Sequence, residues 1–383
     1  MERIKSNHII CGLDEISGYV YFENGTVKEV SQRDLPVSKE YDYTDLYVSA
    51  GFIDIHTHGG GGHRFEGSAD EVVDGCNFHL AHGVTSICPT VSAAYISDMR
   101  TSVESIALAK SSPKLGNNII GAHLEGPYLS LAQTGAQGSE FITPPVIDDY
   151  TALTEDFEGI IARWTYAPEN DEGARFAKYV SERGIISSAG HTNATYSDMK
   201  DALDAGCRLV THLYSCTSTV TRNKGFRSLG VIESAFLEDD IFVEIIADGR
   251  HLPPELIQMI YKIKGRDRVI LVSDSLSIAG TDAKTGRMQS TDFIIEDGVC
   301  KLLDRSAFAG SIATADRLIS VMVNEAKISL KDAVYMITKT PATVMKLDKK
   351  GQILDGYDAD FTVFDEDIDI KAVFVGGSQK YAK

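Results

Sequence analysis

The chain has 383 residues, of which 43% are hydrophobic, so it can bury a full core and has room for roughly two structural units. Its 37 basic and 55 acidic side chains give a net charge of −18 and are interspersed, which excludes the basic stripe that a nucleic-acid backbone requires. The six cysteines are widely spaced without a Cys-x-x-Cys pair, a pattern typical of free thiols in a reducing compartment. No signal core follows the N-terminus, and no uncharged apolar run approaches the roughly 18 residues of a membrane span. These features predict a cytoplasmic protein that binds neither nucleic acid nor membrane.

Both ends of the chain read as short β-strands. Residues 1–50 alternate apolar and polar side chains, and Asn24-Gly25 is a strong signal for a hairpin turn. Strand patterns return at Phe361–Asp365 and Ile370–Val375. We therefore expect residues 1–50 and 345–383 to form one composite β-sandwich domain.

Residues 51–344 instead alternate apolar strands with amphipathic helices such as Ala69–His82 and Glu172–Arg183, which is typical of a parallel sheet with crossover helices. A further hairpin is expected near Thr291–Leu303, before helices at Thr314–Lys327 and Leu330–Met336. Eight βα units predict an α/β fold of the (β/α)₈ TIM-barrel type. The eight expected strands are Phe52–His58, Val84–Thr90, Ile119–Glu125, Ala162–Ala167, Gly184–Ala189, Arg208–Leu213, Ile241–Ala247 and Arg268–Asp274.

Metal-ligand side chains recur where these strands end, which is the edge of such a barrel that carries the active site. His56 and His58 are two residues apart and therefore share one face of the first strand. Glu125, His191 and His212 end the third, fifth and sixth strands. One such residue alone is usually structural, but coincidence at several strand ends predicts a catalytic site for one or two divalent ions. Glu125 would bridge two ions, one held by His56 and His58 and the other by His191 and His212.

Asp274 ends the eighth strand at the same edge. We interpret it as a general base that takes a proton from the attacking water and then, as an acid, returns it to the amine leaving an amide. The alternative is that it caps the next helix. His123, two residues before Glu125, is expected to support the site without binding metal.

Six segments carry a family resemblance, namely Gly51–Gly59, His123–Pro127, Gly190–Ala194, Thr211–Tyr214, Ala247–His251 and Phe308–Ser311. They resemble the N-acetylglucosamine-6-phosphate deacetylases of the amidohydrolase superfamily over nearly the whole chain. The resemblance implies a metal-dependent hydrolase that releases acetate from a 6-phosphorylated N-acetyl amino sugar, and it implies a homodimer. Zinc is the expected metal, with iron, manganese and cobalt as alternatives, because imidazole and carboxylate suit all four.

The resemblance also implies a set of substrate contacts. His251 matches the histidine that contacts the sugar phosphate, Gln137 lies near a position that meets sugar hydroxyls, and Phe308 matches a residue that encloses the acetyl methyl. Arg222 and Arg227 are approximate candidates for the phosphate arginine, which a neighbouring subunit often supplies. Ser215 and Cys216, followed by Thr217, replace the usual Asn-Ala-Met at the substrate wall, which puts recognition of the sugar or phosphate in doubt.

Other functions stay open at this point. The sequence does not separate the glucosamine from the galactosamine epimer, and another N-acyl amine is an alternative substrate. A cyclic-amide hydrolase of the same superfamily is disfavoured, because such enzymes usually have a modified lysine where Glu125 stands. A non-catalytic sugar-phosphate-binding protein is the least favoured alternative, because Asp274 and the full ligand set are present.

Overall fold

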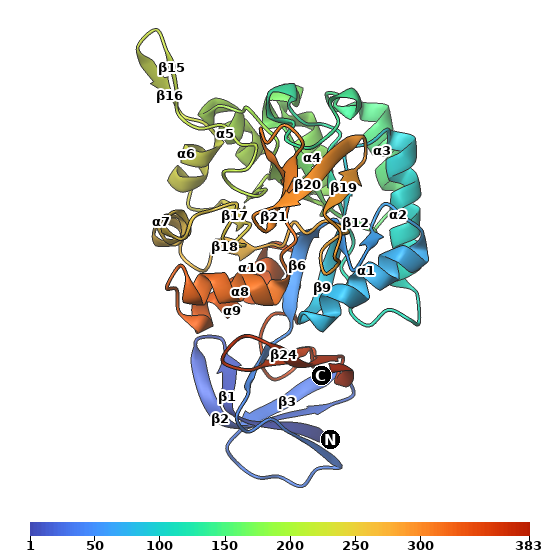
Figure 1. The fold of residues 1–383 in the computed structure, drawn as a ribbon, viewed down its shortest axis with the longest axis vertical. Coiled ribbons are helices and arrows are strands. Elements are labelled where there is room, and N and C mark those ends of the chain that lie inside the picture. The colour runs from blue at the N-terminus through green and yellow to red at the C-terminus, as the bar shows by residue number, and fades with distance from the viewer.

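The computed structural model describes residues 1–383 and divides them between a barrel and a smaller β-unit below it (Figure 1). The β-unit joins both ends of the chain in one sheet, in the order β25-β24-β23-β5-β1-β2-β3, with β4 paired to β1. Its strands are β1 (Glu2–Cys11), β2 (Asp14–Glu23), β3 (Thr26–Ser31), β4 (Lys39–Asp42), β5 (Tyr47–Ala50), β23 (Phe361–Phe364), β24 (Ile370–Val375) and β25 (Ser378–Ala382).

This sheet curls around its own apolar core. Phe22 of β2 and Phe374 of β24 lie on strands that are not neighbours, yet their rings are 6.4 Å apart and both are buried. Asn24 and Gly25 adopt φ values of 50° and 75°, as the predicted hairpin turn between β2 and β3 requires. The prediction of one β-unit built from both chain ends is confirmed, although its strands form a single curled sheet.

Eight parallel strands form the barrel, and they match the eight predicted ones. The first and last meet through their ends, because Asp274 N–H donates to His56 O at 2.9 Å and His58 N–H donates to Ser275 O at 2.8 Å. The (β/α)₈ prediction is therefore confirmed. The strands are β6 (Phe52–Thr57), β9 (Val84–Ser92), β11 (Ala122–Glu125), β12 (Ile161–Tyr166), β13 (Ile186–Ala189), β14 (Leu209–Val210), β17 (Phe242–Ile245) and β18 (Val269–Leu271), with the short β10 (Asn118–Ile119) beside β9.

Ten α-helices accompany the strands, and none is long and apolar enough to cross a lipid bilayer. The fourth starts at Arg175 instead of the expected Glu172, because Gly173 and Ala174 adopt left-handed φ values of 68° and 52°. The helices are α1 (Ala69–Ala81), α2 (Ile96–Lys110), α3 (Ile147–Asp156), α4 (Arg175–Glu182), α5 (Tyr196–Asp204), α6 (Val231–Leu237), α7 (Pro254–Lys264), α8 (Ala315–Asn324), α9 (Leu330–Ile337) and α10 (Lys339–Val344), with 3₁₀ turns at Leu131–Gln133, Ser139–Phe141, Pro168–Asn170 and Glu172–Ala174.

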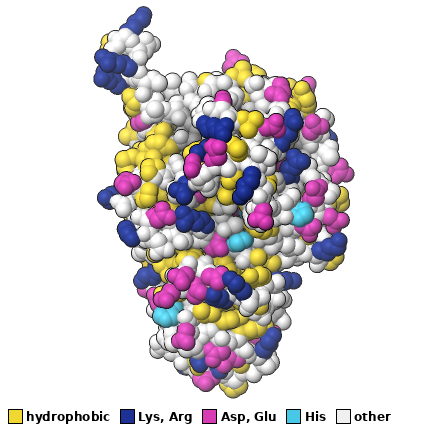
Figure 2. Space-filling model, in the orientation of Figure 1, with side chains coloured by type: hydrophobic (Ala, Val, Ile, Leu, Met, Phe, Trp, Pro, Cys, Tyr) yellow, Lys and Arg dark blue, Asp and Glu magenta, His cyan; other side chains and the backbone are white.

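Three small β-elements lie outside the barrel wall. The predicted hairpin near Thr291–Leu303 is present as β20 (Thr291–Glu296) and β21 (Val299–Leu302), and it grows into a four-stranded sheet with β19 (Thr285–Met288) and β22 (Phe308–Gly310). A short pair, β7 (Gly59–Gly60) and β8 (His63–Arg64), follows the first barrel strand. A second hairpin, β15 (Thr221–Asn223) and β16 (Phe226–Ser228), projects from the body, and basic side chains gather at its tip (Figures 1 and 2).

A buried ion pair inside the barrel connects several of its strands. Arg163 of β12 and Glu244 of β17 are both fully buried and hydrogen-bonded to each other. Arg163 also donates to Ile55 O at 3.1 Å, Ser188 Oγ at 3.0 Å and Thr211 Oγ1 at 3.2 Å. One guanidinium thus connects five strands or strand ends, and its loss would leave the Glu244 charge buried without its partner.

We therefore expect Arg163→Met to lower the free energy of unfolding by about 3–5 kcal/mol, because an unpaired buried charge is costly. Arg100→Met is the matched control, since Arg100 pairs with Asp156 at the surface, where an ion pair contributes about 0–1 kcal/mol. Denaturant unfolding measures both variants. Equal losses of stability in the two would contradict the role of the buried pair.

Candidate metal centre

The six side chains predicted to carry the chemistry converge at one end of the barrel. His56 and His58 come from the end of β6, and Glu125 is the last residue of β11. His191 and His212 each stand two residues beyond β13 and β14, and Asp274 stands three beyond β18. All six are buried, with Asp274 7% exposed. The parallel strands therefore bring together residues that are up to 218 positions apart.

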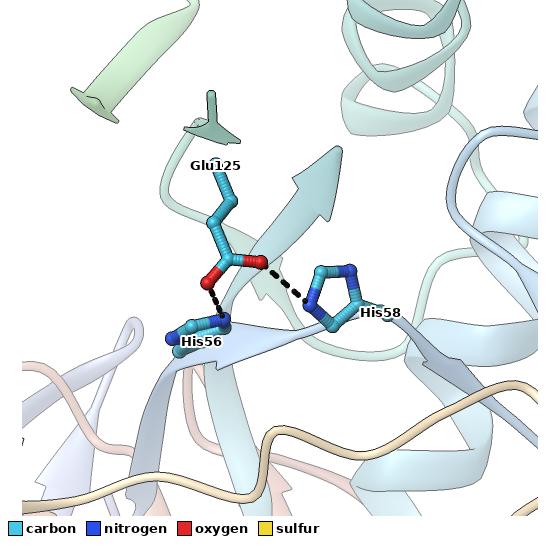
Figure 3. A group of neighbouring side chains, drawn as sticks. All are labelled: His56, His58 and Glu125. Carbon is cyan, nitrogen blue, oxygen red and sulfur yellow. Dashed lines mark ion pairs between the residues drawn. The ribbon is translucent and has the colours of Figure 1, made fainter. Parts of the chain in front are cut away.

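Glu125 lies at the centre of the group. Its Oε1 is 3.3 Å from His56 Nε2, 3.3 Å from His191 Nε2 and 3.0 Å from His212 Nε2. Its Oε2 is 3.3 Å from His58 Nε2, so the two histidines at the end of β6 face different oxygens of one carboxylate (Figure 3). The Glu125 carboxylate therefore lies between two pairs of histidines, His56 with His58 and His191 with His212.

The donor atoms fit divalent metal ions. Each of the groups His56–His58–Glu125 and Glu125–His191–His212 offers ligand atoms that lie within 4.8 Å of one another. His56 Nε2 is buried without a hydrogen-bond partner, and His191 Nε2 and His212 Nε2 face each other at 3.1 Å. Lone pairs that meet in this way need a proton or a cation between them, and imidazole with carboxylate is a donor set that zinc, iron and related ions accept.

The electrostatics of the group also favour a positive charge at its centre. Burial would lower the pKa of His56, but the charges of Glu125 and Asp274 outweigh it and raise that pKa to about 9. His58 responds in the same way, and its pKa rises to about 10. Burial works against the ionised form of Glu125, yet the neighbouring imidazoles hold its pKa well below the ordinary value.

Asp274 faces the same centre from the last strand. Its Oδ1 is 3.4 Å from His56 Nε2 and 3.3 Å from His58 Nε2. Burial opposes its ionisation, but the two imidazoles lower its pKa from the ordinary value. Asp274 is therefore a carboxylate at neutral pH, which is the form that accepts a proton.

Further residues contact the Nδ1 atoms of the histidine rings, on the side away from Glu125. Glu244 Oε2 lies 3.3 Å from His56 Nδ1, and the Gln133 carbonyl oxygen lies 2.9 Å from His191 Nδ1. These supporting contacts were not predicted from the sequence, although a lone acid in the apolar stretch Ile241–Ala247 was a signal for Glu244. His123 engages both ring nitrogens with Thr90 and Thr165, so it supports the barrel interior and stays outside the donor set, as expected.

A cavity of about 250 Å³ opens beside the metal-facing groups. It is lined by five of the predicted substrate residues, namely Gln137, Ser215, Cys216, His251 and Phe308. The Gln137 amide is already engaged, since its nitrogen donates to Glu125 Oε2 at 2.8 Å and its oxygen accepts from Ala93 N–H at 2.9 Å. His251 Nδ1 lies 2.8 Å from Asp248 Oδ2, and its ring contacts the Phe308 ring edge-on.

The two candidate phosphate arginines lie elsewhere. Arg222 and Arg227 are paired across the exposed β15–β16 hairpin and do not line the cavity. Phe226, between them in sequence, is 80% exposed. The structure thus separates the predicted substrate residues into five on the cavity wall and two on a projecting arm.

Comparison with known proteins identifies the family of this barrel. The model of the amidohydrolase family matches residues 47–381. The N-acetylglucosamine-6-phosphate deacetylase of Bacillus subtilis is 30% identical over 362 residues, covering 92% of this chain and 90% of its own. The N-acetylgalactosamine-6-phosphate deacetylase of a Shewanella species is 29% identical over 378 residues, covering 98% and 90%. The crystal structure of N-acetylglucosamine-6-phosphate deacetylase from Pasteurella multocida superposes with a TM-score of 0.93 at 27% identity, over the full length of both chains. The chain belongs to the amidohydrolase family.

Proposed function

We propose that this protein is a metal-dependent deacetylase that hydrolyses N-acetylglucosamine 6-phosphate to glucosamine 6-phosphate and acetate. The observation that carries the proposal is the convergence of four imidazoles and Asp274 on the Glu125 carboxylate, at the wall of a cavity of about 250 Å³. The names of the relatives support an amino-sugar phosphate as the substrate class. Six unpaired cysteines support a reducing, cytoplasmic location.

In this proposal, His56, His58, Glu125, His191 and His212 hold one or two divalent ions, of which zinc is the first candidate. Such an ion supplies Lewis-acid chemistry, polarising the amide carbonyl and making water easier to deprotonate. Asp274 takes a proton from the attacking water, whose oxygen forms the new bond to the acetyl carbon. Asp274 then donates that proton to the nitrogen as the carbon–nitrogen bond breaks, so that a neutral amine and acetic acid leave, and the acid loses its remaining proton to solvent to become acetate.

The galactosamine epimer is the second candidate substrate. A relative named for N-acetylgalactosamine 6-phosphate is 29% identical, against 30% for the first glucosamine relative, so identity does not separate them. Ser215 and Cys216 line the cavity where the resemblance implied Asn and Ala, so this wall differs from the family pattern. A cyclic-amide hydrolase and a non-catalytic binding protein stay less favoured, because Glu125 occupies the third-strand position and Asp274 is held in its ionised form.

We expect metal-dependent acetate release from N-acetylglucosamine 6-phosphate, lost on chelation and restored by zinc. Asp274→Asn should lower kcat by about 100- to 10,000-fold, because it removes the group that transfers the proton. The assay compares this substrate with its galactosamine epimer and with both unphosphorylated sugars. Metal content measured in the Asp274→Asn protein shows whether the ions are still bound. No turnover of any N-acetyl sugar by metal-loaded protein would refute the proposal.

We propose that the sugar phosphate is bound by His251 of one subunit and by the β15–β16 hairpin of the second subunit of a homodimer. The β15–β16 hairpin supports this idea, since it projects from the body and carries exposed Arg222, Lys224 and Arg227 at its tip (Figures 1 and 2). Arginine suits a phosphate because its planar fork donates two parallel hydrogen bonds.

The variants Arg222→Ala and Arg227→Ala, made separately, test whether the β15–β16 hairpin binds the phosphate. One variant should lower kcat/KM for the phosphorylated sugar by about 10- to 100-fold, as loss of a charged hydrogen bond predicts, while turnover of the unphosphorylated sugar stays unchanged. Lys224→Ala is the control on the same hairpin, and sedimentation velocity gives the oligomeric state. If neither arginine matters but His251→Ala removes the preference for phosphate, one subunit alone recognises the phosphate.

A further inference from the structure

The metal-facing histidines differ in what fixes their protonation. Glu244 and the Gln133 carbonyl can only accept, so His56 and His191 must donate through Nδ1, and Nε2 is the nitrogen left to bind an ion at the centre. His58 Nδ1 instead lies 3.0 Å from Ser92 Oγ, the last residue of β9. A hydroxyl both donates and accepts, so Ser92 alone leaves the tautomer of His58 undecided.

Glu66 removes this ambiguity. Its Oε1 lies 2.9 Å from Ser92 Oγ and also accepts from Ser92 N–H at 3.2 Å. Because a carboxylate only accepts, the Ser92 hydroxyl must donate to Glu66, and its oxygen is left to accept from His58 Nδ1–H. A proton is thereby held on Nδ1, and Nε2 is the nitrogen of His58 that is left to bind a metal ion at the centre.

The loop that carries Glu66 is held over His58. Phe65 is fully buried, and its N–H donates to His58 O at 3.2 Å, which draws the segment after β8 back onto the first barrel strand. Gly61 and Gly62 allow the reversal with φ values of 64° and 95°. Glu66 itself lines a second cavity of about 240 Å³, which shares His58 and Met288 with the first but is lined by none of the predicted substrate residues.

We propose that Glu66 is a positioning residue that, through Ser92, fixes the tautomer of His58 and so controls metal binding in the His56–His58 half of the centre. The inference rests on the proposed function, since it requires an ion in that half. It adds a residue that touches neither substrate nor metal. The His191–His212 half has its own support in the Gln133 carbonyl, so it should not depend on Glu66.

Titration of metal-free protein with zinc, followed by calorimetry, tests the proposal. Glu66→Ala should raise the dissociation constant of one ion by about 10- to 100-fold, the usual effect of losing such an outer contact, and leave the other ion unchanged. Glu66→Gln keeps an oxygen that accepts from Ser92 and should bind as the wild type does. Arg287→Gln is the matched control, because Arg287 lines the same second cavity without contacting Ser92.

A double variant shows whether Glu66 acts through Ser92. Adding Glu66→Ala to Ser92→Ala should weaken zinc binding no further than Ser92→Ala alone, whereas additive losses would mean an independent, merely structural effect. Unchanged binding in Glu66→Ala, or equal weakening of both ions, overturns the inference and leaves the proposed function standing. Failure of the wild type to bind any zinc overturns the proposed function itself. If Glu66→Ala does not fold, Ser92→Ala carries the same test with the same outcomes.

Discussion

The active end of this barrel is organised by one buried carboxylate. Glu125 is 2% exposed, and its two oxygens lie 3.0–3.3 Å from the ring nitrogens of four histidines. A carboxylate removed from water is stable only where positive charge or hydrogen-bond donors compensate it. Three strand ends, those of β6, β13 and β14, must therefore deliver four imidazoles to the same point on the Glu125 carboxylate.

The side chains inside the barrel, below Glu125, also constrain the positions of the histidines. Glu244 contacts the ring of His56 on one side and the guanidinium of Arg163 on the other, so the metal-facing layer is continuous with the ion pair that joins the strands. The strand ends above it are bent, since His191, His212 and Asp274 have φ values of 47°, 29° and 47°. Such conformations cost about 1–3 kcal/mol each and persist only where the surrounding structure imposes them. The stability of the barrel thus maintains the geometry of the site.

The convergence of these side chains was predictable from the sequence, because the signal was local. A strand alternates its side chains, so His56 and His58 had to share a face, and placing each ligand at a strand end needed only the eight apolar runs. Contacts between distant residues had no such signal. Ser92 and Glu66 are 26 positions apart, and neither is unusual in its own segment. The late start of α4 and the four-stranded growth of the predicted hairpin depend on left-handed residues and tertiary pairing, which a local pattern does not reveal.

Hydrolysis and substrate choice are carried by different parts of the chain. The candidate ligands and Asp274 lie at the ends of barrel strands, where hydrogen bonds to neighbouring strands fix the backbone. The cavity wall opposite them comes from connecting segments, namely Ser215 and Cys216 beyond β14, His251 beyond β17 and Phe308 in the inserted sheet. Loops tolerate substitution better than strands do, so the wall can change while the metal-facing set stays intact. Ser215 and Cys216 depart from the pattern of the resemblance in this wall, and the side chains around Glu125 do not, so the departures lie in the cavity wall and leave the convergent histidines and carboxylates unaltered.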